Sequence, residues 1–165
     1  MKHTNHFFLL ACAFAGVLVT PATAQINTTS DEPKREIIVH GFRSPSIGLE
    51  YRRGLLGYHA GVYPTIIKPS ENGEAKNTLF AKTGVTAYLF EVPTGGARKS
   101  EIFTSVSYLR GLNQGWTNAV QFEPGLRWAM TKNFDFRVGA SFLKGADRPL
   151  RINPTIGVSW NFSRN

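Results

Sequence analysis

The clearest pattern in the chain is a regular alternation of apolar and polar residues over segment 152–162. Apolar side chains occupy every second position: Ile152, Pro154, Ile156, Val158, Trp160 and Phe162. The positions between them are polar or small: Asn153, Thr155, Gly157, Ser159 and Asn161. Successive side chains of a β-strand point to opposite faces. This segment therefore predicts a strand with one apolar face and one polar face.

A period of two recurs through the chain after residue 35, and no helical period appears there. We predict eight strands, over 36–43, 46–53, 58–67, 78–90, 101–111, 118–130, 134–145 and 152–162. Most have about the 9–11 residues with which a tilted strand crosses a bilayer. Short turns alternate with longer polar connections. The predicted fold is therefore all-β, an eight-stranded antiparallel up-and-down transmembrane β-barrel.

The first 24 residues have the three parts of a cleaved secretory signal peptide. Lys2 gives a positive start, 7–19 is apolar, and Ala22-Thr23-Ala24 is a small-residue cleavage site. Residues 25–35 form a polar, flexible leader before the barrel domain, 36–162, and 163–165 form a short tail. Cleavage would remove the only cysteine, Cys12. Too few apolar residues precede Cys12 for a lipoprotein signal, so we expect no lipidation and no disulfide.

The chain is basic, with 19 Lys and Arg against 11 Asp and Glu and a formal net charge of +8. Export argues against nucleic acid as a partner and favours the anionic phosphates of a membrane surface. A soluble β-sandwich or a lipocalin-like binder would instead place the apolar faces inside. The sequence favours a membrane barrel over these soluble folds, because the predicted strand directions bring large aromatic residues to the same level along the barrel axis. These form a predicted interfacial girdle: Trp128, Phe134, Phe136, Trp160 and Phe162.

With its signal peptide, amphipathic strands and a last strand that ends in Phe162, the chain resembles the small eight-stranded outer-membrane barrels of the OmpA and OmpX type. The resemblance covers 36–162. It implies a monomer in the outer membrane of a Gram-negative-type bacterium, in contact with lipid and lipopolysaccharide. It also implies that the barrel-assembly machinery reads Phe162, although Ser163-Arg164-Asn165 follow where the family pattern ends on the aromatic.

The inward faces of the predicted strands carry charges. An eight-stranded barrel is just wide enough to be filled by side chains, and buried charges need partners. The sequence therefore predicts a structural, salt-bridged lumen and a non-enzymatic role in membrane integrity or surface contact. The predicted lumen charge cluster comprises Glu50, Arg52, His59, Lys82, Glu123, Arg127, Asp135 and Arg137.

An outer-membrane hydrolase that modifies lipid A is the alternative function. A four-residue loop at 54–57 would set Arg52 opposite His59 and leave Glu50 as a diagonal neighbour able to orient an imidazole base. Barrel enzymes that deacylate lipid A carry a serine two residues after the histidine, and here that position is Gly61. We therefore assign no catalytic residue. We expect His40 near the outer rim, with no partner that the sequence identifies, and no spacing predicts a metal or cofactor site.

Parity across the sixth and seventh strands fixes their register, since inward residues must face inward residues. A three-residue loop, 131–133, satisfies this rule, with Asn133 suited to a left-handed position. Arg127 then lies opposite Arg137, a like-charge pair that needs interleaved carboxylates. We predict an Arg127–Asp135–Arg137 cluster completed by at least one glutamate, Glu123 or one from across the lumen such as Glu50, that reaches Arg137.

Overall fold

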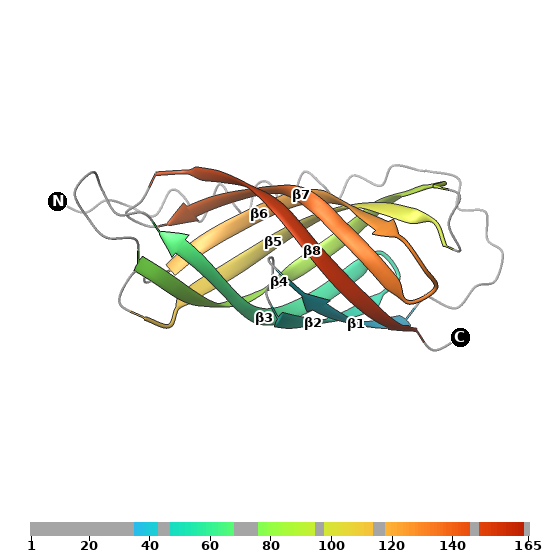
Figure 1. Ribbon diagram of the computed structural model, residues 1–165, viewed down its shortest axis with the longest axis horizontal. Helices are drawn as coiled ribbons and strands as arrows, with labels where there is room; N and C mark the ends of the chain where they lie inside the picture. The colour runs from blue at the N-terminus through green and yellow to red at the C-terminus, as the bar shows by residue number, and fades with distance from the viewer. Residues whose placement is uncertain are drawn as a thin grey trace. The chain divides into compact units, whose positions relative to one another are not determined.

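The computed structural model describes residues 35–42, 47–67, 76–94, 98–113, 118–145 and 149–163. The predicted signal peptide, 1–24, and nearly all of the leader lie outside these ranges. In the described part, eight strands form one closed barrel in which each strand pairs with its neighbours in sequence (Figure 1). β1 closes the barrel against β8, antiparallel like the other pairs. Within these ranges, no helix is long and apolar enough to cross a membrane.

The predicted all-β, eight-stranded antiparallel barrel is confirmed, with strand ends that differ from the prediction by a few residues. The strands are β1 Arg35–Gly41, β2 Ile47–Arg53, β3 Leu56–Ile67, β4 Lys76–Val92, β5 Ser100–Gly111, β6 Asn118–Ala129, β7 Phe134–Gly145 and β8 Arg151–Ser163. The turns after β2, β4 and β6 and the end of β8 lie at one end, here named the turn end (at the right in Figure 1). The opposite end is named the loop end.

Burial alternates along the strands in the way the sequence pattern requires. In β1, Glu36, Ile38 and His40 are buried, while Ile37 between them is half exposed. Apolar residues at the alternate positions of β6, β7 and β8 have exposed or half-buried side chains: Phe122, Leu126, Phe136, Val138, Ile156 and Val158. The barrel therefore has a polar interior and an apolar outer wall.

The register predicted for β6 and β7 is confirmed. Trp128 pairs with Phe136, and Arg127 lies opposite Arg137. The turn differs in one detail. The only non-glycine residue with a positive φ among the described ranges is Phe42, so Asn133 is not left-handed. Instead the Thr131 hydroxyl accepts a hydrogen bond from the backbone N–H of Phe134 at 3.0 Å and organises the turn.

The turn between β2 and β3 is shorter than predicted. Arg53 pairs with Leu56 and Glu50 pairs with His59, so the loop has two residues rather than four. Gly54 adopts φ 62°, the positive value that a two-residue hairpin demands at its first position. The shift brings Glu50 directly opposite His59 instead of diagonal to it.

Glycines on the inner surface let neighbouring strands approach closely. A Cβ on Gly61 would collide with the backbone of Ile47 and Gly48. A Cβ on Gly41 would meet only Val158 Cγ2, at an ordinary 3.7 Å. Gly61 therefore has a steric role that Gly41 does not share.

We predict that Gly61→Ala lowers the free energy of unfolding by about 1–3 kcal/mol, as overpacking generally does. Gly41→Ala is the matched control and should change it little. Urea unfolding of the purified, folded protein measures both values. Equal effects of the two substitutions would show that the close approach at Gly61 is not what the strand pairing depends on.

Candidate functional site: the charged lumen

The lumen carries two groups of charged side chains, stacked along the barrel. The first, named the turn-end cluster, contains three carboxylates and three guanidinium groups from five strands and the β4–β5 connection: Glu36, Arg52, Arg98, Glu101, Arg127 and Asp135. All except Arg98 are buried. Its formal charges cancel, which is the condition for burying so many of them.

Arg127 is the centre of the turn-end cluster. Its Nη1 donates hydrogen bonds to Glu36 Oε2 and to Glu101 Oε2, each at 3.0 Å. Its Nε donates to Asp135 Oδ2 at 2.8 Å. One buried guanidinium therefore joins β1, β5 and β7 to its own strand, β6.

Arg52 and Arg98 complete the cluster from opposite sides. Arg52 binds Glu101 with both terminal nitrogens, each at 2.7 Å, the two-pronged geometry that gives Arg–carboxylate pairs their strength. Arg98 donates to Asp135 and lies 3.8 Å from Glu36. Arg98 comes from the connection between β4 and β5, and its side chain is 19% exposed. It therefore covers the cluster at the turn end.

The second group, named the central cluster, lies farther into the barrel. It comprises Glu50, Glu123, Lys82, Arg137, His40 and His59, all buried. Lys82 pairs with Glu123 at 3.3 Å, and Arg137 pairs with Glu50 at 3.5 Å. Two carboxylates thus face two cations, and the second group is also formally neutral when both imidazoles are uncharged.

Glu50 is the most connected acceptor of the central cluster. It receives the Tyr88 hydroxyl at 2.6 Å and lies 3.0 Å from His40 Nε2. The rings of Tyr88 and Phe103 separate the two clusters. The guanidinium of Arg52 lies 3.8 Å from the centroid of the Tyr88 ring, and that of Arg137 lies 4.1 Å from the centroid of the Phe103 ring. These cation–π contacts stabilise arginines that have left water.

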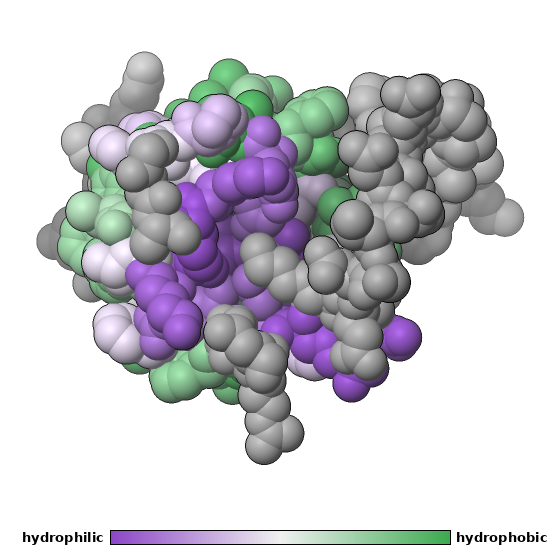
Figure 2. Space-filling view, turned by 90° about the vertical axis from the view of Figure 1, so that its right-hand side faces the viewer, coloured by the Kyte–Doolittle hydropathy of each residue, from purple (hydrophilic) through white to green (hydrophobic). Residues whose placement is uncertain are grey.

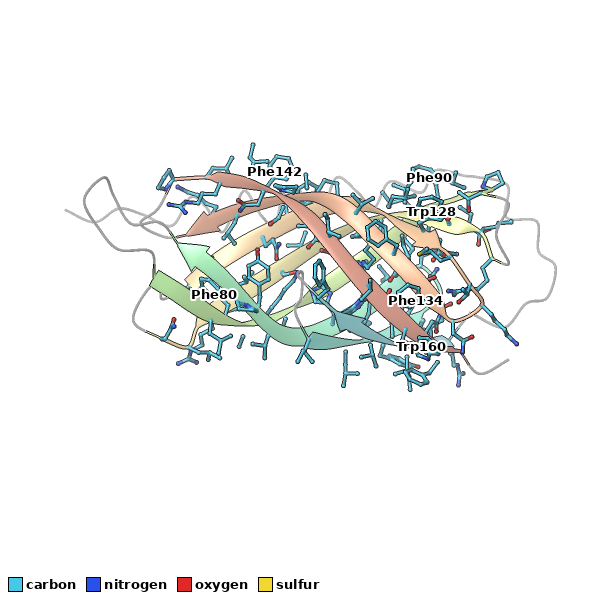
Figure 3. All side chains as sticks on the ribbon, in the orientation of Figure 1. Phe80, Phe90, Trp128, Phe134, Phe142 and Trp160 are labelled. Carbon is cyan, nitrogen blue, oxygen red and sulfur yellow. The ribbon has the colours of Figure 1, made fainter. Side chains whose placement is uncertain are left out.

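A third layer closes the lumen toward the loop end. It is an apolar group of Tyr63, Phe80, Leu109, Ala119 and Leu143. Phe80, labelled in Figure 3, lies inside the half of the barrel away from the turn end. From the turn end to the loop end, the described lumen is therefore filled by the turn-end cluster, the Tyr88 and Phe103 rings, the central cluster and this apolar group.

His59 takes part in a hydrogen-bonded chain that sequence reasoning did not foresee. Its Nε2 lies 2.9 Å from Ser107 Oγ, and its Nδ1 lies 3.1 Å from Thr86 Oγ1. The Thr86 hydroxyl donates in turn to Glu50 Oε2 at 3.4 Å. A hydroxyl beside an imidazole is the arrangement of a nucleophile and its base. Ser107 is only 1% exposed, however.

The space beside this chain is small. A cavity of about 10 Å³ is lined by His40, Glu50, His59, Lys82, Thr86, Ser105, Glu123 and Arg137. A cavity of this size accommodates about one water molecule. It has no room for an acyl chain or a sugar. In the ranges that the structure describes, no group of three or more His, Cys, Asp or Glu side chains is placed to hold a metal ion.

All eight residues predicted for the lumen charge cluster have buried side chains: Glu50, Arg52, His59, Lys82, Glu123, Arg127, Asp135 and Arg137. The single Arg127–Asp135–Arg137 cluster is wrong in one respect. Asp135 contacts Arg127, whereas Arg137 turns away toward Glu50. The two arginines lie side by side but belong to different clusters, and that separation resolves their repulsion.

The prediction for His40 is wrong. It is 3% exposed and lies 3.0 Å from Glu50 and 3.1 Å from an Arg137 nitrogen, rather than at the outer rim. Sequence reasoning also missed Glu36, Glu101 and Arg98. The pattern does indicate two of the inward residues. Glu36 and His40 are an even number of positions apart in the same strand, so their side chains point to the same face.

All five aromatic residues of the predicted girdle lie on the outside of β6, β7 and β8: Trp128, Phe134, Phe136, Trp160 and Phe162. Phe134 and Trp160 have ring centroids 6.3 Å apart, and Trp160 and Phe162 have centroids 6.5 Å apart. Trp128, Phe134 and Trp160 all lie in the half of the barrel at the turn end (Figure 3).

Comparisons of the chain with protein-family models, curated proteins and solved structures found no match. The function is therefore inferred from the residues and their geometry.

We predict that Asp135→Ala lowers the free energy of unfolding by about 3–5 kcal/mol, because it leaves buried guanidinium groups without their carboxylate. Glu91→Ala is the control. Glu91 accepts from Lys99 at 2.7 Å on the surface, where ion pairs contribute little. Urea titrations of the purified, folded variants compare the two. Similar stability of the Asp135 and Glu91 variants would contradict a structural role for the cluster.

Proposed function

We propose that this chain is a small outer-membrane β-barrel of the OmpA and OmpX type. It spans the bilayer as a closed wall and acts in membrane integrity or surface contact rather than in catalysis or transport. The observation that carries the proposal is the inverted distribution of polarity. Two clusters of charged side chains are buried in the interior, and the outer surface carries large apolar ones. In water that distribution is unfavourable, and in lipid it is the expected one.

The apolar wall extends around the barrel. Ile47 on β2, Phe90 on β4 and Ile152 on β8 are 72%, 67% and 63% exposed. Figure 2 looks along the barrel at its turn end and shows hydrophilic residues in the middle with hydrophobic ones around them. Soluble monomers rarely expose apolar patches larger than a few hundred Å². The wall therefore supports a lipid environment.

Aromatic residues near the turn end support the same environment. Besides the residues already described, Tyr51 and Tyr58 pair across β2 and β3 and are both exposed. Rings with a polar tip settle at the boundary between hydrocarbon and headgroups. Phe162 is outward and half exposed, as expected of a terminal aromatic read by the barrel-assembly machinery. The proposed location is the outer membrane of a Gram-negative-type bacterium, with lipid and lipopolysaccharide around a monomeric barrel.

The filled lumen argues for a wall rather than a channel. Three layers of side chains occupy it, and the cavity in the central cluster has the volume of about one water molecule. Contacts with partners outside the membrane would then belong to the loops. The loop segments 43–46, 68–75, 114–117 and 146–148 lie outside the described residues.

The alternatives fit the geometry less well. A lipocalin-like binder would line its cavity with apolar residues, and this lumen is charged. A lipid A hydrolase gains a serine, Ser107, beside His59. However, the cavity beside His59 is too small for the substrate to enter. In addition, Gly61, which occupies the position where barrel deacylases carry their serine, has no room for a serine side chain.

The decisive experiment is cell fractionation together with gel mobility before and after heating. We expect the protein in the outer-membrane fraction, with heat-modifiable migration. Recovery in the soluble periplasmic fraction would refute the proposal.

Within this proposal, Val138→Arg should lower the free energy of unfolding, measured in vesicles, by about 2–4 kcal/mol, since Val138 lies on the outer wall away from the turns. Met130→Arg is the matched control. Met130 is also outward but adjoins the β6–β7 turn, where the cost of a cation falls to about 0–1 kcal/mol. A Val138→Arg variant as stable as wild type would mean that Val138 does not meet lipid.

The hydrolase alternative has its own test. We predict that His59→Ala and Ser107→Ala leave the lipid A of an overproducing strain unchanged and chiefly reduce the stability of the barrel. Mass spectrometry of extracted lipid A checks this. Overproduction of wild type that yields a deacylated species, with either variant abolishing it, would overturn the structural assignment.

A further inference from the structure

The positive charge of the barrel lies on its outside. Both lumen clusters are formally neutral, as shown above. Among the described residues, Glu91 is the only carboxylate that is not buried, whereas several arginines and lysines face outward. Lys99 has Glu91 as its partner, and Arg110 lies opposite Asn118.

Arg35 and Arg53 are different, because they stand directly opposite each other. Their Cα atoms are partners across β1 and β2, and both side chains are exposed on the outer face. No carboxylate contacts either of them in the part of the chain that the structure describes. Like charges in directly opposed positions destabilise a sheet. An arrangement of this kind is relieved by a bound anion.

The surroundings of the pair indicate which anion fits. The next outward pair along β1 and β2 is Ile37 and Tyr51, and Ile37 also pairs with Phe162 on β8. Two cations therefore adjoin a continuous apolar and aromatic surface at the turn end. Guanidinium groups bind phosphate through paired hydrogen bonds, and the neighbouring surface suits acyl chains.

We propose that Arg35 and Arg53 form a binding site for the phosphate of an anionic phospholipid in the leaflet at the turn end. The site rests on the proposed function, because it requires the outer wall to meet lipid. It goes beyond that function by naming the headgroup chemistry and the two residues that select it. A free phosphate ion shares the charge but gains nothing from the apolar surface.

Native mass spectrometry of the folded protein, released from detergent micelles, tests the site directly. The probes are phosphatidylglycerol, phosphatidylcholine and inorganic phosphate, each titrated separately. We expect the first phosphatidylglycerol to bind more tightly than phosphatidylcholine and inorganic phosphate to bind weakly. Because each basic residue near a membrane surface contributes about fivefold to the attraction of anionic lipid, Arg35→Gln and Arg53→Gln should each weaken that first event by about fivefold.

Arg110→Gln is the matched control, an outward arginine opposite Asn118 rather than another arginine. It should leave binding of the first phosphatidylglycerol unchanged. Gel mobility before and after heating verifies that each exposed-site variant has folded.

The proposal is overturned if the Arg35→Gln/Arg53→Gln double variant binds phosphatidylglycerol as wild type does. It is also overturned if Arg110→Gln weakens binding equally, or if inorganic phosphate binds as tightly as the lipid. Each of these results leaves the membrane assignment intact. A soluble, non-heat-modifiable protein would instead refute the proposed function itself, so the two failures are distinguishable.

Discussion

The structure depends on the pairing of charges inside a barrel too narrow to hold bulk water. Arg127 shows the constraint most directly, since one guanidinium accounts for contacts with Glu36, Glu101 and Asp135. Removing any member leaves an uncompensated charge in a medium where an isolated ion is very costly. The same contacts tie β1, β5, β6 and β7 together across the lumen. The ion network therefore complements the hydrogen bonds between neighbouring strands.

The layered lumen also limits what the molecule can do. Charge neutrality within each cluster removes the need for a counter-ion, and the Tyr88 and Phe103 rings fill the space between the clusters. His59 and Ser107 show how a constellation that resembles catalytic chemistry can satisfy buried polar groups instead. Their contact gives each side chain a hydrogen-bond partner, which polar side chains need wherever they point into a closed interior. In the proposed structural role, the burial of Ser107 distinguishes this contact from a catalytic one.

The eight strands and the β6–β7 register were predictable because they follow from local rules. A period of two fixes which residues face inward, and a short turn then fixes which residues oppose one another. The direction of a long side chain within the lumen does not follow from those rules. Arg127 and Arg137 lie opposite each other as predicted, yet they reach toward different carboxylates. His40 and Arg98 were misjudged or missed for the same reason. Their partners, Glu50 and Asp135, come from other parts of the barrel, and only its closed geometry brings them together.

Among the described residues, two pairs of opposed arginines occur in the barrel, one on each side of its wall. Inside, Arg127 and Arg137 are separated by carboxylates that draw them to different heights. Outside, Arg35 and Arg53 have no such carboxylates among the described residues. Water screens an exposed pair, so the outer one is tolerable where the inner one would not be. Like charges therefore oppose each other on both faces of the sheet, and different partners offset the repulsion on each face. Inside, the chain itself supplies the anions, whereas outside, water screens the pair and the proposed lipid phosphate supplies the anion.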